Sequence, residues 1–185
     1  MGSLGWEFAD ADEPGVAYLS LPVTGEEARS LLRGARPKVV PRAFVTESGR
    51  YADVMTLGWP GLYALSPSLS STMGRFRGVA FSPLVIDGGP ADFKVLSVTG
   101  RCGSVDYNKS IQLNRTHGFV RLRGLRVDTP RDGAEVAVPT NLESVLVTAR
   151  VAETLRRLNF ENISLVSIDT EEFDISDKKL SAGNS

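Results

Sequence analysis

The residues whose types could support covalent chemistry lie close together, in and just after the stretch FKVLSVTGRCGSVDYNKS (93–110). Cys102 is the only cysteine of the chain and His117 is its only histidine, with Asp106 and Ser110 between them. A thiol or hydroxyl nucleophile needs a base that takes its proton and a group that orients this base. Cys102 or Ser110 acting with His117 would therefore suit a small hydrolase or transferase.

The surrounding pattern favours a non-catalytic interpretation of these residues. No helix is predicted to begin beside Cys102, and a lone cysteine belongs to the most frequently buried residue types. The chain also lacks the G-x-S-x-G motif of many serine hydrolases. We therefore expect strand and turn around Cys102, with Asp106 and Ser110 bracing the turn, and no catalytic residues. The hydrolase or transferase remains one alternative, and a structural or scaffold subunit that uses the face with Arg121 and Arg123 is another.

Composition argues against several other classes of protein. One cysteine and one histidine cannot supply the ligands of a structural zinc site, and no phosphate-binding or dinucleotide-binding glycine motif is present, so we expect neither metal nor cofactor. A hard cation held by Asp169, Glu171 and Asp174 is the weaker alternative. A formal net charge of −1 does not favour nucleic acid as a partner. The sequence shows no secretory signal and no membrane span, and it cannot form an internal disulfide. We expect a cytoplasmic protein without a membrane partner.

Two charged segments could bind a partner. The first is a basic stripe that includes Arg121 and Arg123, on a stretch whose alternating pattern places Val120 and Leu122 on the opposite face. The second is an acidic segment near the C-terminus, in which apolar residues are interleaved with the charges. A segment of this kind can contact a basic surface and speed association. Its candidate partner-binding residues are Asp169, Glu171, Glu172, Phe173 and Asp174.

The coarse pattern predicts an α+β fold with mixed or antiparallel sheets and a few short helices. Thr24 and Glu27 have the spacing of a capping box and predict a helix over 24–36. Segments 62–87 and 145–169 each predict a strand, a helix and a second strand, with Ser66 and Thr148 as N-cap candidates. One strand–helix–strand unit is thus used twice.

The domain organisation expected from the sequence has three parts. Residues 1–15 are acidic and contain Gly and Pro, so they predict a flexible N-terminal arm. Residues 16–177 predict a single globular domain, with two lobes meeting near 88–92 at the GGPA turn. Residues 178–185 predict a disordered tail.

The order of these features resembles a family of bacterial immunity proteins that accompany polymorphic toxins, known as immunity family eleven. The first shared motif is a Val-Asp stretch followed by Ser, here Val105, Asp106 and Ser110. Ser97 stands where many such sequences carry Asn. The second shared motif is a late strand–helix–strand element. In this chain it comprises Val147, Thr148, Leu155, Leu158, Ile163 and Leu165.

The resemblance covers roughly residues 93–169 and implies a protein that is not an enzyme. Such a protein binds a cognate toxin and blocks its active site or the entry of its substrate. If that toxin is a nuclease with a basic cleft, the acidic segment at 169–177 would imitate the charge of the nucleic acid.

Overall fold

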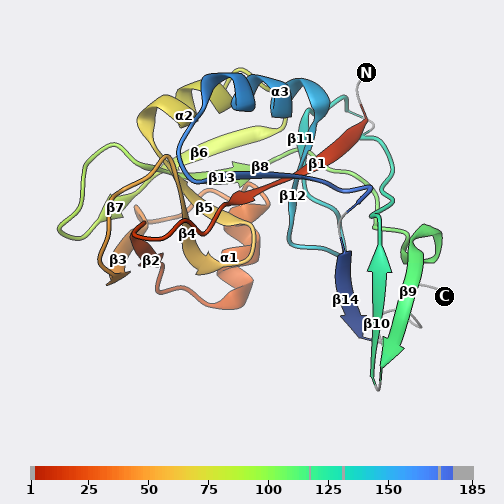
Figure 1. Cartoon of the computed structure of the whole chain (residues 1–185). Coiled ribbons are helices and arrows are strands. Elements are labelled where there is room, and N and C mark those ends of the chain that lie inside the picture. Colours follow the sequence, from red (N-terminus) through yellow and green to blue (C-terminus); the bar gives the residue numbers. More distant parts are fainter. Residues whose placement is uncertain (1–2, 117, 131, 171, 177–185) are drawn as a thin grey trace.

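The computed structural model describes residues 3–116, 118–130, 132–170 and 172–176, which form an α+β fold (Figure 1). Three α-helices accompany fourteen strands, and these strands form four mostly antiparallel sheets. The expected fold class is therefore confirmed. The tail predicted at 178–185 lies outside the described residues.

The first half of the chain builds a four-stranded sheet in the order β4-β5-β8-β6. Its strands are β4 (Val54–Trp59), β5 (Leu62–Leu65), β8 (Lys94–Val98) and β6 (Val79–Pro83). Strands β5 and β6 are joined by helix α2 (Pro67–Met73), and both pair antiparallel with β8, which lies between them. Helices α1 (Gly25–Leu32) and α2 lie on opposite sides of this sheet (Figure 1), which explains why every residue of β5 is buried.

The second four-stranded sheet repeats this arrangement in the order β11-β12-β1-β13. Its strands are β11 (Val136–Ala137), β12 (Val145–Thr148), β1 (Leu4–Asp10) and β13 (Ile163–Ser167). Helix α3 (Ala149–Leu158) joins β12 to β13, and β1 pairs antiparallel with both. The predicted double use of one strand–helix–strand unit is therefore confirmed, and each copy encloses a strand from elsewhere in the chain.

The helices begin where the sequence predicts. Thr24 and Glu27 form the complete capping box of α1, and the Ser66 hydroxyl accepts a hydrogen bond from the backbone N–H of Leu69 in α2. Thr148 holds the N-cap position of α3, but its side chain makes no capping hydrogen bond. Leu158, at the end of α3, is 48% exposed and is not part of the core.

The prediction of a flexible arm over 1–15 is wrong for β1, which is a central strand. Leu4 and Phe8 on this strand are buried, and the Phe8 ring meets Tyr63 of the first sheet edge-on at a centroid distance of 5.7 Å. A lobe boundary at 88–92 is also wrong. This turn leads from β7 (Val85–Ile86) into β8, which lies inside the first sheet.

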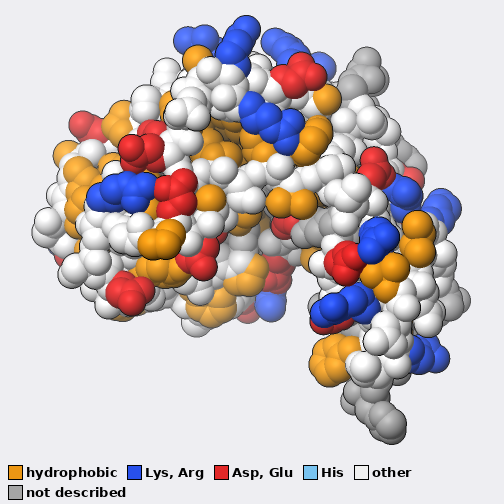
Figure 2. Space-filling model, viewed as in Figure 1, with side chains coloured by type: hydrophobic (Ala, Val, Ile, Leu, Met, Phe, Trp, Pro, Cys, Tyr) orange, Lys and Arg blue, Asp and Glu red, His pale blue; other side chains and the backbone are white. Residues whose placement is uncertain are grey.

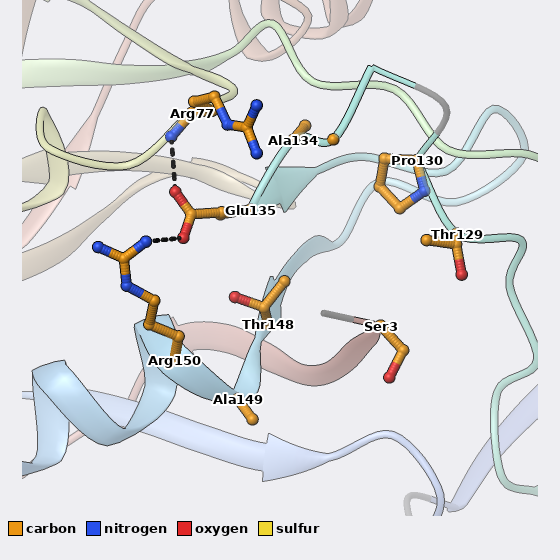
Figure 3. A pocket seen from close by; sticks show the side chains of 10 residues that line it. Ser3, Arg77, Thr129, Pro130, Ala134, Glu135, Thr148, Ala149 and Arg150 are labelled. Carbon is orange, nitrogen blue, oxygen red and sulfur yellow. Dashed lines mark hydrogen bonds and ion pairs between the residues drawn. The ribbon is translucent and has the colours of Figure 1, made fainter. Parts of the chain in front are cut away.

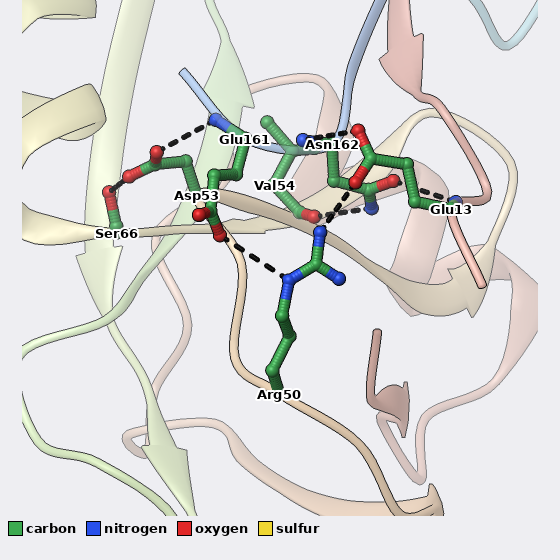
Figure 4. A network of polar contacts seen from close by, with 7 residues as sticks. All are labelled: Glu13, Arg50, Asp53, Val54, Ser66, Glu161 and Asn162. Carbon is green, nitrogen blue, oxygen red and sulfur yellow. Dashed lines mark hydrogen bonds and ion pairs between the residues drawn. The ribbon is translucent and has the colours of Figure 1, made fainter. Parts of the chain in front are cut away.

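A network of polar contacts joins the two repeated units (Figure 4). Asn162, which is 2% exposed, donates from its side chain to the carbonyl oxygen of Val54 at 2.8 Å and accepts from the backbone N–H of Glu13 at 3.0 Å. The Asp53 carboxylate accepts from the backbone N–H of Glu161 at 2.9 Å and from the Ser66 hydroxyl. Buried polar groups cost free energy unless they are paired, so this network specifies how the units pack.

The remaining strands form two smaller sheets. One has the order β2-β3-β7, with β2 (Tyr18–Ser20) antiparallel and β7 parallel to β3 (Arg42–Glu47). The other has the order β14-β10-β9 and extends away from the rest of the molecule (Figure 1).

We expect Phe8→Ala to lower the free energy of unfolding by about 3–5 kcal/mol, because it leaves a cavity between the two main sheets. Urea unfolding followed by circular dichroism measures this change. Glu7→Gln on the same strand is the control and should change stability by less than about 0.5 kcal/mol. Equal, small effects of both substitutions would mean that β1 contributes little to the fold.

Candidate binding surface

The sheet that extends from the body consists of β9 (Ile111–Thr116), β10 (Phe119–Arg123) and β14 (Glu172–Ser176). We call it the projecting sheet. Strand β10 pairs antiparallel with both neighbours, so β9 and β14 are its edges. Successive residues of a strand point to opposite faces, and the register therefore decides which side chains share a face.

One face of the projecting sheet is covered. Val120 and Leu122 of β10 are 0% and 2% exposed. They pack with Phe173, which lies opposite Leu122, and with Tyr107, whose ring is 6.0 Å from that of Phe173. The expected alternation along β10, with the arginines facing outward, is confirmed.

The other face carries a ladder of ion pairs. Arg121 lies opposite Asp174, and its Nε and Nη2 donate to the two carboxylate oxygens at 3.1 and 3.2 Å. Arg123 lies opposite Glu172 and donates from Nε at 3.1 Å. The Arg121 guanidinium lowers the pKa of the Asp174 carboxyl, and the carboxylate raises the pKa of Arg121. All four side chains are between 41% and 54% exposed, so the pairs fix the register more than they add stability.

Large apolar side chains flank this ladder. Phe119 is 53% exposed on the same face of β10, and Ile111, opposite Arg123 on β9, is 59% exposed. Figure 2 shows hydrophobic, basic and acidic side chains side by side on the projecting sheet. Sequence reasoning did not select Phe119 or Ile111. The sequence did contain a signal for Phe119, because this large apolar residue shares the outward-facing positions of β10 with Arg121 and Arg123.

Of the predicted partner-binding residues, Glu172, Phe173 and Asp174 lie on β14 of this sheet, and the two carboxylates among them do not form a free acidic cluster. Asp169 pairs with Arg126, in addition to the two pairs of the ladder. Phe173 is half-buried and belongs to the covered face. Glu171 lies outside the described residues. Carboxylates of the acidic segment thus pair with arginines of the basic stripe. From the sequence, these two segments are separate candidate binding surfaces.

Several contacts anchor the base of the projecting sheet to the body. The side chain of Asn141 accepts from the backbone N–H of Val105 at 2.7 Å and donates to its carbonyl oxygen at 3.2 Å. The Asp106 carboxylate accepts from the backbone N–H of Asn108 at 3.2 Å, so it braces a turn as expected. The Ser110 side chain does not brace this turn, because its hydroxyl is buried without a hydrogen-bond partner.

Cys102 belongs to the apolar cluster beneath this base. It is 6% exposed and packs with residues that include Val105 and Leu125. Burial raises the pKa of its thiol to about 11, so the thiol is protonated near pH 7. His117, its partner in the hydrolase or transferase alternative, lies outside the described residues.

Within the described ranges, no three His, Cys, Asp or Glu side chains are grouped so as to hold a metal ion. None of the described helices has the length and hydropathy needed to cross a membrane. Comparison with models of protein families and with curated protein sequences gave no match.

We expect the Cys102 thiol to react slowly with a disulfide reagent such as DTNB in the folded protein and rapidly in concentrated urea. At about pH 8 its raised pKa leaves roughly one thiolate in a thousand. The rate should rise about tenfold per pH unit up to the pKa of the folded state. The stability that the buried thiol contributes is present below the unfolded pKa near 9 and is lost as the pH rises through about 11. Rapid reaction of the folded protein with DTNB near pH 7 would contradict the predicted protection of the thiol and would favour the hydrolase or transferase alternative.

Proposed function

We propose that this chain is an immunity protein that neutralises a cognate bacterial toxin by binding it through the exposed face of the projecting sheet. The motifs around Val105 and Thr148 resemble immunity family eleven, and the proposal takes the class of function from that resemblance. The observation that carries the site is the exposed face itself, where Phe119 and Ile111 flank two ion-paired arginines.

The composition of this face supports protein binding. Aromatic residues and arginines are enriched at protein interfaces and among the residues that dominate binding energy. Phe119 offers a rigid apolar anchor, while Arg121 and Arg123 are held in place by their carboxylate partners and lose little freedom on binding. The side chains on the opposite face keep the sheet rigid through their packing with Tyr107 and Phe173.

The ion pairs determine which kind of toxin surface can bind the exposed face of the projecting sheet. An unpaired acidic segment would imitate nucleic acid and would suit a nuclease with a basic cleft. Here each carboxylate of the ladder is matched by an arginine on β10, so the face has no net charge from these pairs. It therefore suits a partner surface with an apolar pocket for Phe119 and with its own donors and acceptors around that pocket.

The test is a growth assay with the toxin domain encoded beside the gene for this chain. Co-expression with the chain should restore growth of a sensitive bacterium, and the purified proteins should form a complex. Exchanging Arg121 and Asp174 (R121D/D174R) keeps an ion pair within the sheet but inverts the charges presented to the partner. We expect this variant, and Phe119→Ala, to weaken the affinity at least about tenfold and to reduce protection.

The matched control is the exchange R42D/D87R, which inverts an exposed ion pair between β3 and the residue that follows β7. It should leave both affinity and protection unchanged. If the unmodified chain neither binds nor protects against that toxin, the immunity proposal is wrong. If it protects but R121D/D174R and Phe119→Ala behave like the control, the toxin binds another face.

A further inference from the structure

A cavity of about 380 Å³ lies where the two repeated units meet (Figure 3). Arg77, from the turn between α2 and β6, contributes to it from the first unit. Glu135, Thr148 and Arg150 contribute from the second unit. The carbonyl oxygen of Arg77 accepts a backbone hydrogen bond from Glu135 at 2.9 Å, so the two halves of the cavity wall are fixed to each other.

The N-terminus of α3 opens onto this cavity. The first N–H groups of a helix have no partner within the helix and carry a partial positive charge. The first turn of α3 contains no acidic residue, and the positive charge of Arg150 in this turn is balanced by Glu135. Thr148 is 3% exposed, yet its hydroxyl neither caps the helix nor has any other hydrogen-bond partner. Leaving a buried hydroxyl unpaired costs roughly 1–3 kcal/mol, so this position favours a ligand oxygen.

The repeated unit provides an internal comparison. The backbone N–H of Ser66 donates to the carbonyl oxygen of Asp53 at 2.9 Å, and the backbone N–H of Thr148 donates to the carbonyl oxygen of Glu135 at 3.0 Å. Asp53 directly precedes β4 and Glu135 directly precedes β11, so the two acidic residues are equivalent.

Their carboxylates, however, have different partners. The Asp53 carboxylate accepts from the Ser66 and Ser68 hydroxyls at the start of α2. The Glu135 carboxylate accepts instead from the backbone N–H of Arg77 at 3.2 Å and from Arg150 Nη1 at 2.8 Å (Figure 3). In the first unit an anion of the protein itself thus sits at the helix start. In the second unit the equivalent carboxylate is paired with Arg150 and leaves the Thr148 hydroxyl without a hydrogen bond.

We propose that the cavity at the start of α3 binds the phosphate group of a small phosphate monoester. The helix N–H groups, the Thr148 hydroxyl and the Arg77 guanidinium supply donors to a tetrahedral dianion. The Arg77 side chain has no ion pair with a described residue, whereas Arg150 compensates the charge of Glu135. Ser3 and Thr129 on the rim add hydroxyl groups, and the volume leaves room for the group that carries the phosphate. This proposal does not depend on toxin binding.

The experiment is an NMR titration of the backbone amides of the full chain at constant ionic strength maintained with sodium chloride. Inorganic phosphate is the first probe, and ribose 5-phosphate is the second. We expect saturable shifts of the amides of Ala149, Arg150 and Val151 with either probe. Tighter binding of ribose 5-phosphate would identify a monoester as the ligand, and equal binding would mean that phosphate alone is recognised.

Variants decide whether the site is the one described. Arg77→Gln should weaken phosphate binding about tenfold, because it removes a charge-assisted contact. Thr148→Val keeps the shape of the side chain and should also weaken it. Arg75→Gln, an exposed arginine that does not line the cavity, is the matched control and should bind as the unmodified chain does. Absence of saturable shifts with both probes, or equal affinity of the Arg77→Gln and Arg75→Gln variants, would overturn the proposal.

Discussion

The two strands of each repeated unit cannot pair with each other, because the helix between them carries the chain two positions along the sheet. A third strand has to fill the gap with antiparallel pairing, and without it the strands would leave buried N–H and C=O groups unpaired. Strand β8 fills this place in the first unit and β1 in the second. The C-terminal half of the chain therefore cannot complete its sheet without residues 4–10.

The same repetition explains why one helix start differs from the other. Both acidic residues that precede the edge strands β4 and β11 bond through their carbonyl oxygen to the N-cap residue. Aspartate, which has the shorter side chain, turns back to the serines of α2, while Glu135 reaches Arg150. The backbone arrangement is kept, but the carboxylate accepts from hydroxyl groups in the first unit and from an arginine in the second. Thr148, although it occupies the N-cap position, is consequently left with an unpaired hydroxyl.

Local signals were sufficient for the helices, the repeated unit and the alternation of β10, since each depends on residues close in sequence. The pairing of distant strands was not predictable from these signals. The alternation of Leu4, Trp6 and Phe8 was present, but the acidic composition around it led to the wrong prediction of an arm. The basic stripe and the acidic segment were both recognised, yet only the register of β10 against β14 shows that they pair with each other.

Residues 121–135 run from the projecting sheet to the cavity and contribute to both proposed sites. The middle of this segment is fixed to the body by two backbone contacts. The backbone N–H of Leu125 donates to the carbonyl oxygen of Ile168 at 2.7 Å, and Val127 forms an antiparallel β-bridge with Val105. Arg121 therefore lies on one side of the anchored stretch, and Thr129 and Glu135 lie on the other. Substitutions on the sheet face should leave the cavity intact, and those in the cavity should leave the sheet intact. The two sites can be tested separately for this reason.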